Sequence, residues 1–180
     1  MRARSFKRGV AAVAAAVLAV ALGAAPAPAL AEDGAVATDA TTLQAALDDA
    51  NVRIITLGDD VTYSMTVPAG RTVTLDLNGH TLTNDSGKHT ITNNGTLTIT
   101  GQGTIDNVSH ARAALYNDGG DATIAGGTFT RSAEAGTPGG ANGNSWYVVN
   151  NESGSLKMSG GTVSGKSGFS SCVRNGGTMD

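Results

Sequence analysis

The basic side chains Lys88, His89 and Arg112 form the first group in the sequence whose types and spacing could do chemistry. Lys88 and His89 are adjacent and precede Ile91, and the repeat spacing of the chain places Arg112 beside them on the next turn. Such a basic group could bind the carboxylate of an acidic sugar or a phosphate. The alternative is a rim of solvated charges at a corner of the fold, because charged side chains are mostly exposed and contribute little there.

A second candidate ligand-binding pair is Trp146 and Tyr147, which follow a Gly/Pro/Ala/Asn-rich stretch over about 133–144. Adjacent aromatic rings at the edge of a loop could stack on sugar rings. The alternative is that one ring packs over the root of the loop. Long insertions often carry the binding face of a repeat protein, so the region 133–147 is the first place where we expect a ligand.

Catalytic and metal-binding residues are not expected. One Cys cannot form a disulfide within the chain or a Cys-based zinc cluster, and Cys172 reads as an ordinary strand residue. His80 lies in a turn, where a general base is possible but a solvated side chain is commoner. In one outward-facing column, no two carboxylates fall on neighbouring turns. We therefore expect neither a calcium site nor a catalytic acid pair there, and no cofactor. The members of this column are Asp76, Thr98, Thr123, Lys157 and Asp180.

The charge balance argues against a nucleic-acid partner. The chain has 12 Lys and Arg against 15 Asp and Glu, a formal charge of −3, and no basic patch. Removing the first 31 residues takes away four of the basic residues and no acid, which leaves 8 − 15 = −7. A modestly acidic protein binds anionic polymers poorly unless a cation bridges them.

Residues 1–31 are typical of an export signal. Basic residues Arg2 to Arg8 precede an uncharged apolar stretch from Val10 to Ala25, and Ala29-Leu30-Ala31 fits a signal-peptidase site. The alternative is a transmembrane helix, but the stretch is shorter than the ~20 residues that a span needs. We therefore expect a secreted or cell-surface protein without a membrane span after cleavage, with 32–38 as a linker.

A repeat dominates the rest of the chain. Its unit is apolar-x-apolar, a short Gly/Asn turn, and Thr followed by an apolar residue, with starts at 75, 97, 122 and 156 and an incomplete copy at 179. The intervals are 22, 25, 34 and 23 residues, and the long one contains the expected inserted loop at about 133–144. Stacked short strands of this kind form a β-solenoid, whereas the Leu-rich consensus is absent. The expected inward columns are Leu77, Ile99, Ile124, Met158 and Leu82, Ile105, Phe129, Val163.

A short helix is expected at 39–50, before the coils at 53–180. Thr41-x-x-Gln44 fits a capping box, and the apolar residues share one face, so the helix could cover the open end of the solenoid. The first strands are expected at 54–55 and 61–67. The expected apolar face consists of Leu43, Ala46, Leu47 and Ala50.

The run from Val67 to Leu82 resembles the first coils of right-handed parallel β-helix proteins of the pectin-lyase-like superfamily, and the helix before it is similar to their N-terminal cap. The resemblance implies an all-β, right-handed parallel β-helix over 39–180. More narrowly, the chain resembles adhesin-like bacterial secreted or surface proteins. An Asn after each strand is similar to the internal Asn ladders of such folds. These residues are Asn93, Asn117, Asn150 and Asn175.

This resemblance implies the function only broadly, because one fold hosts many activities. We expect a non-catalytic secreted or cell-surface protein that presents loops to a polysaccharide or a host or cell-surface glycan. The alternative is a fragment of a polysaccharide lyase or glycoside hydrolase, although the clustered acids and Arg base of pectate lyases are not matched here. Because the coil at Met179-Asp180 is incomplete, we expect a C-terminally truncated solenoid.

Overall fold

The computed structural model describes residues 33–84, 87–109, 112–132, 147–165 and 172–180. The expected signal peptide at 1–31, the expected inserted loop at 133–144 and the candidate ligand residue Trp146 lie outside these ranges. The described residues belong to one compact unit.

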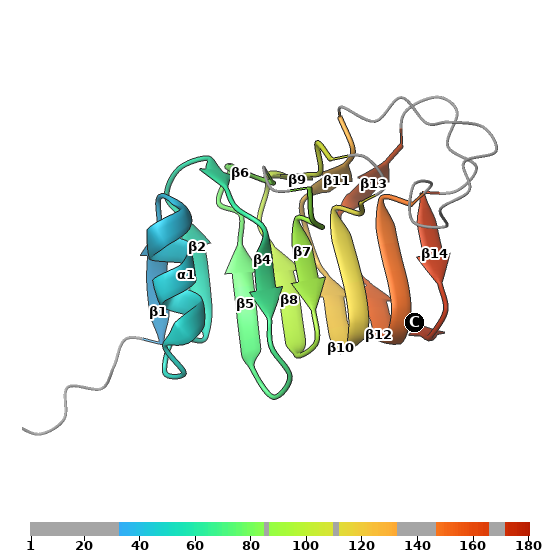
Figure 1. The fold of residues 1–180 in the computed structure, drawn as a ribbon, viewed down its shortest axis with the longest axis horizontal. Helices are drawn as coiled ribbons and strands as arrows, with labels where there is room; N and C mark the ends of the chain where they lie inside the picture. Colours follow the sequence, from blue (N-terminus) through green and yellow to red (C-terminus); the bar gives the residue numbers. More distant parts are fainter. Residues whose placement is uncertain (1–32, 85–86, 110–111, 133–146, 166–171) are drawn as a thin grey trace, which may run out of the picture. The chain divides into compact units, whose positions relative to one another are not determined.

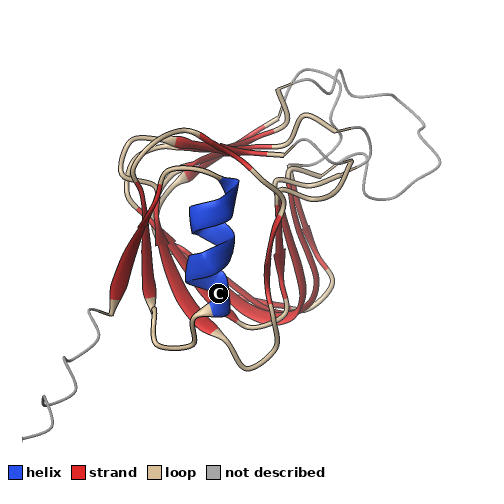
Figure 2. Ribbon diagram, turned by 60° about the vertical axis from the view of Figure 1, so that its left-hand side comes forward, coloured by secondary structure: helices blue, strands red, loops and turns tan. Residues whose placement is uncertain are grey.

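This unit is an all-β parallel solenoid of about 5 turns with one short helix, so the expected fold class is confirmed (Figure 1). Every strand pair is parallel, and successive strands occupy three faces in turn (Figure 2). Face 1 contains β4 (Met65–Val67), β7 (Ile91–Asn93), the first parts of β10 (Leu115–Ile124) and β12 (Val149–Met158), and β14 (Val173–Asn175).

Faces 2 and 3 complete each turn. Face 2 contains β1 (Gly34–Ala37), β2 (Ile54–Leu57), β5 (Thr72–Asp76), β8 (Thr96–Thr100), the second parts of β10 and β12, and β15 (Thr178–Met179). Face 3 contains β3 (Val61–Thr62), β6 (Thr81–Thr83), β9 (Thr104–Asp106), β11 (Thr128–Thr130) and β13 (Thr162–Ser164).

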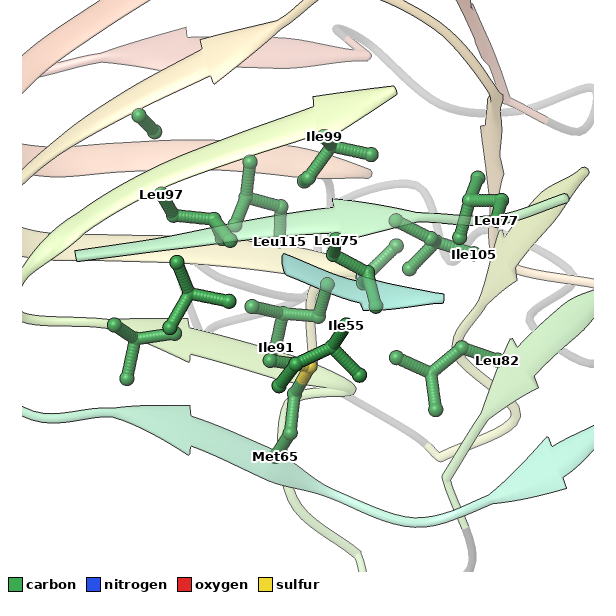
Figure 3. Close-up of a cluster of buried hydrophobic side chains, with 14 of the residues drawn as sticks. Ile55, Met65, Leu75, Leu77, Leu82, Ile91, Leu97, Ile99, Ile105 and Leu115 are labelled. Atoms are coloured by element: carbon green, nitrogen blue, oxygen red, sulfur yellow. The ribbon is translucent and has the colours of Figure 1, made fainter. Parts of the chain in front are cut away.

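Apolar side chains point inward at every second residue and stack from turn to turn (Figure 3). The column predicted for face 3 is confirmed, because Leu82, Ile105, Phe129 and Val163 are register partners. In face 2, Ile99 pairs with Ile124 and Ile124 with Met158, as predicted. The core therefore consists of columns of stacked apolar side chains that run along the solenoid.

Leu77 is not part of the face 2 column, contrary to the prediction. Leu75 pairs with Ile99, and Leu77 lies buried at the following corner. That corner holds one residue more than the next one, and its turn residues Asn78 and Gly79 have left-handed φ values of 47° and 88°. The prediction aligned the apolar residues that immediately precede each turn. Because inward positions recur every second residue, this alignment placed Leu77 two positions away from Leu75, the true partner of Ile99.

The same shift corrects the outward column of face 2. Thr74, not Asp76, is the partner of Thr98, and Asp76 is the partner of Thr100. From Thr98 the column continues as predicted through Thr123 to Lys157. The first member of the expected column was therefore wrong and the next members were right.

Four Asn side chains form a ladder along the inner side of face 1. Three of them are fully buried, the last, Asn175, is exposed, and the third member differs from the prediction. The Nδ2 groups of Asn93 and Asn117 each donate to the Oδ1 atom of the next Asn at 2.7 Å, and Asn151 donates to Asn175 at 2.5 Å. Asn151 takes the place expected for Asn150, because the inward position lies two residues after Val149. Each rung satisfies polar groups that would otherwise be buried without a partner.

Helix α1 (Ala40–Asp48) crosses the end of the solenoid, and Leu43, Ala46 and Leu47 are buried as predicted (Figure 2). Its capping box differs from the prediction. The Asp39 carboxylate accepts from Thr42 N at 2.8 Å, and Thr42 Oγ1 accepts from Asp39 N at 3.1 Å. Ala50, expected on the apolar face, is exposed and lies beyond the helix.

The C-terminal end of α1 is tied to the solenoid by Arg71. Its guanidinium donates to the carbonyl oxygens of Ala46, Leu47 and Asp49 at 3.2, 3.2 and 2.8 Å. A cation at this end of a helix satisfies the last carbonyl groups and complements the helix dipole. The position of α1 against the first turns is therefore fixed by a long-range polar contact as well as by the core.

Two further segments differ from their expected structure. The expected linker at 32–38 contains β1, which pairs with β2 and buries Ala37. The expected strand at 61–67 is two strands, β3 and β4, because the chain turns from face 3 to face 1 at residues 63–64.

Candidate functional site

The corner between faces 3 and 1, here called the loop corner, carries the long connections of the solenoid. In the first turn this corner is the dipeptide 63–64. In later turns the connections span 84–90, 107–114, 131–148 and 165–172. A solenoid tolerates added residues where the chain leaves the stacked strands, and such places often carry function.

Lys88, His89 and Arg112 come together at the loop corner, as the repeat spacing predicted. The register of β7 and β10 places Lys88 opposite Arg112. Arg112 Nε donates to the carbonyl oxygen of Gly87 at 3.0 Å, and the backbone N–H of Ala113 donates to His89 Nδ1 at 2.9 Å. Lys88 is exposed, whereas His89 and Arg112 are partly buried.

His89 is a neutral imidazole at pH 7. Burial, together with the positive charges of Arg112 and Arg131, lowers its pKa from 6.5 to about 4. The hydrogen bond from Ala113 N occupies the Nδ1 lone pair, so the proton of the neutral ring lies on Nε2. His89 therefore acts as a fixed hydrogen-bond donor at neutral pH and is unsuited to act as a general base there.

This protonation state predicts a loss of stability in acid. The folded pKa of His89 lies below the unfolded one, so its contribution is fully present above pH 6.5 and is lost as the pH falls toward 4. We expect the loss to be about 2 kcal/mol, reduced from the full linkage value because part of the ring contacts solvent. Urea unfolding at pH 7 and pH 4 should show a smaller acid loss for His89→Asn, whose amide oxygen can accept from Ala113 N without titrating.

The control for this experiment is His80→Asn, which removes a histidine from the corner between faces 2 and 3. His80 Nδ1 lies 3.7 Å from Asp60 Oδ1, far along the turn from His89. If His89→Asn loses as much stability between the two pH values as the wild type, the neutral state of His89 is not the cause.

Tyr116 completes the loop-corner group, and the sequence analysis missed it. Its ring stacks on His89 with centroids 4.3 Å apart and planes 9° from parallel. Burial raises the pKa of Tyr116, with further contributions from the charges of Asp118 and Glu152, so the hydroxyl stays protonated. The available signal was an aromatic residue at an outward position between the inward residues Leu115 and Asn117.

Beyond Tyr116, the outward side of face 1 carries a charged pair. The register of β10, β12 and β14 aligns Tyr116, Asn150 and Arg174. Arg174 Nη1 donates to Asn150 Oδ1 at 3.1 Å and forms an ion pair with Glu152. Face 1 thus carries on successive turns the Tyr116 ring, the fully buried amide of Asn150 and the guanidinium of Arg174 paired with Glu152.

The remaining candidates lie near this surface or away from it. Tyr147 is partly buried at the loop corner, where the neighbouring Val148 accepts from Ala114 N at 2.9 Å. Its expected partner Trp146 lies outside the described residues. Cys172 is partly buried and packs against the core next to β14. Arg131, which the sequence analysis did not single out, is fully buried and adds to the positive potential at His89.

In the parts of the chain that the structure describes, no three His, Cys, Asp or Glu side chains are placed to bind a metal ion together. Within the same ranges, no helix has the length and apolar character needed to cross a bilayer.

Comparison of the chain with protein-family models, with curated protein sequences and with solved structures finds no match.

Proposed function

We propose that this chain is a secreted or cell-surface β-helix protein that binds carbohydrate at the loop corner without transforming it. The observation that carries the proposal is the stacked pair His89 and Tyr116 held beside Arg112 and Lys88. Aromatic rings combined with a few fixed polar and cationic groups are typical of sites that bind sugars. We propose further that the chain is an adhesin-like protein of the pectin-lyase-like superfamily.

The group is already ordered before any ligand arrives. His89 is fixed by Ala113 N and by its stack on Tyr116, and Arg112 is fixed by the carbonyl group of Gly87. Ordered side chains lose little conformational entropy on binding, which favours affinity. The Nε2–H of His89 and the cations of Lys88 and Arg112 offer donors only, so they suit ligand oxygen atoms, including carboxylates.

Export is the second part of the proposal and rests on residues 1–31. The described part of the chain begins at Asp33, whose carbonyl oxygen accepts from Arg53 N and Ile54 N at 2.8 and 2.7 Å. Cleavage after Ala31 would therefore leave β1 intact. Protein recovered from the medium or the cell surface should begin at Glu32, whereas recovery with residues 1–31 still attached would contradict export through this signal.

Arg112→Gln is expected to weaken carbohydrate binding at least about 10-fold, because hydrogen bonds from a charged donor contribute about 1.5–3 kcal/mol. The measurement is isothermal titration of the mature protein with oligogalacturonate and cello-oligosaccharides. Arg53→Gln is the matched control, since it removes one exposed Arg immediately before β2, outside the loop-corner group, and changes the net charge equally. Thermal melts of both variants show whether the fold is retained.

Two results would contradict the proposal. Equal affinities of Arg112→Gln and Arg53→Gln would remove the loop corner as the binding site. Release of unsaturated products or new reducing ends from the same saccharides, with or without calcium, would favour the alternative that the chain is part of a polysaccharide lyase or glycoside hydrolase.

A further inference from the structure

A groove runs between α1 and the first turns of the solenoid, on both sides of Tyr63. It consists of two depressions of about 490 and 330 Å³ that share Gln44, Asp48 and Tyr63. The smaller one is also lined by Thr66 on face 1 and by Lys88 of the loop corner. The groove is therefore continuous with the group formed by Lys88, His89 and Arg112.

The shared residues form one hydrogen-bonded chain. The hydroxyl of Tyr63 donates to Gln44 Oε1, and Gln44 Nε2 donates to Asp48 Oδ1 at 2.7 Å. This arrangement fixes the orientation of the Gln44 amide. The second amide hydrogen of Gln44 and the second carboxylate oxygen of Asp48 remain able to pair with a ligand. Arg71 holds α1 in place, so the groove exists without a ligand.

Tyr63 lies one turn before His89. The backbone N–H of Tyr63 donates to the carbonyl oxygen of Thr83 at 2.7 Å, just before the connection 84–90, and Lys88 of that connection lines the same depression as Tyr63. Adjacent turns are about 4.8 Å apart. A linear ligand bound at His89 and Arg112 can therefore extend along the loop corner into the groove at Tyr63 without leaving the surface.

The two ends of this path differ in charge. Lys88, at the loop-corner end of the smaller depression, and Arg112 favour an anionic group there, whereas the Asp48 carboxylate, which lines both depressions, disfavours one beside Tyr63. An amide hydrogen and a carboxylate oxygen side by side suit the neighbouring hydroxyl groups of a neutral sugar, and the Tyr63 ring supplies an apolar wall.

We propose that the groove around Tyr63 is a neutral-sugar subsite continuous with the loop-corner site, and that the ligand is a mixed glycan in which acidic and neutral sugars adjoin. This inference rests on the proposed function and names its ligand class. Asp48 is a specificity residue in it, because its charge discriminates against a second acidic unit.

The test compares two probes on the mature protein. Isothermal titration uses a hyaluronan hexasaccharide, which alternates uronic acid with N-acetylhexosamine, and an oligogalacturonate hexamer, in which every unit is acidic. The wild type should bind the mixed hexasaccharide about 10-fold more tightly. Asp48→Asn should bring the ratio of the two affinities close to one, mainly by strengthening binding of the all-acidic probe.

Tyr63→Phe supplies an independent variant. It removes the hydroxyl that orients Gln44 but keeps the ring, so it should weaken binding of the mixed hexasaccharide about 3- to 5-fold. Asp49→Asn is the matched control for Asp48→Asn, since Asp49 is the adjacent acid, accepts from Asn51 N at 2.9 Å and does not line the groove. Asp49→Asn should leave the affinity ratio unchanged.

The outcomes separate this inference from the proposed function. If Arg112→Gln weakens both probes while Asp48→Asn and Tyr63→Phe alter neither affinity, the loop-corner site stands and the neutral subsite is wrong. A wild type that binds the all-acidic hexamer as tightly as the mixed one also overturns the subsite. If neither probe binds, or if Arg112→Gln has no effect, both the subsite and the loop-corner site are wrong.

Discussion

Gly154→Ala is expected to destabilise the solenoid by about 3 kcal/mol. Gly154 has a left-handed φ of 88°, and a Cβ atom there would lie 2.1 Å from the carbonyl oxygen of Gly120 on the preceding turn. The left-handed backbone costs an alanine about 1 kcal/mol, and forcing two stacked backbones apart adds about 2 kcal/mol. Urea unfolding followed by circular dichroism measures the change.

Gly119→Ala is the matched control for this prediction. Gly119 lies at the same corner one turn earlier with a φ of 83°, but the nearest atom to its Cβ position is Ser153 Oγ at 3.9 Å. Gly119→Ala should therefore lose only the cost of placing an alanine in the left-handed backbone conformation, about 1 kcal/mol of unfolding free energy. Equal destabilisation by the two substitutions would show that close stacking of the turns does not restrict position 154.

Asn117→Ala is expected to cost about 3 kcal/mol of unfolding free energy, because it interrupts the buried Asn ladder. The Asn117 amide accepts from Asn93, donates to Asn151 Oδ1 and also contacts the carbonyl oxygen of Gly120 at 2.8 Å. Alanine would leave those buried acceptors without their donor. Urea unfolding should show a lower midpoint, and hydrogen exchange should be faster at the amides of β7 and β12.

Asn94→Ala is the comparison for the ladder. Asn94 is partly exposed, and its amide donates to the carbonyl oxygen of Asp118 at 2.8 Å. Solvent can replace this bond, so the expected loss is below about 1 kcal/mol. A loss at position 117 no larger than that at position 94 would mean that the ladder contributes little to stability.

Local patterns were sufficient to predict the solenoid, one inward column completely and the other inward column apart from its first member. Alternation of apolar and polar residues, interrupted by Gly and Asn turns, predicts short stacked strands, and Leu82, Ile105, Phe129 and Val163 indeed stack. The prediction of the inward column of face 2 failed at its first member, Leu77, because the number of residues in a corner depends on the backbone conformation of that corner. The strand β1 was missed because Gly34–Ala37 pairs with β2 through its backbone and has little distinctive side-chain pattern.

The candidate site was predicted only in part. The repeat spacing brought Lys88, His89 and Arg112 together, because residues at equal positions of a repeat become neighbours on adjacent turns. The stack of Tyr116 on His89 depends on the directions of two side chains, and no spacing rule gives those directions.

The sequence by itself determined that the chain forms parallel coils with columns of apolar side chains inside and a row of Asn residues along the inner side of one face. These features depend on side-chain type and periodicity. Only the tertiary structure decided the protonation state of His89 and the chain of contacts from Tyr63 through Gln44 to Asp48. The physical reason is that both depend on burial and on charges and donors supplied by segments distant in sequence, which become neighbours only when the coils stack and α1 covers their end.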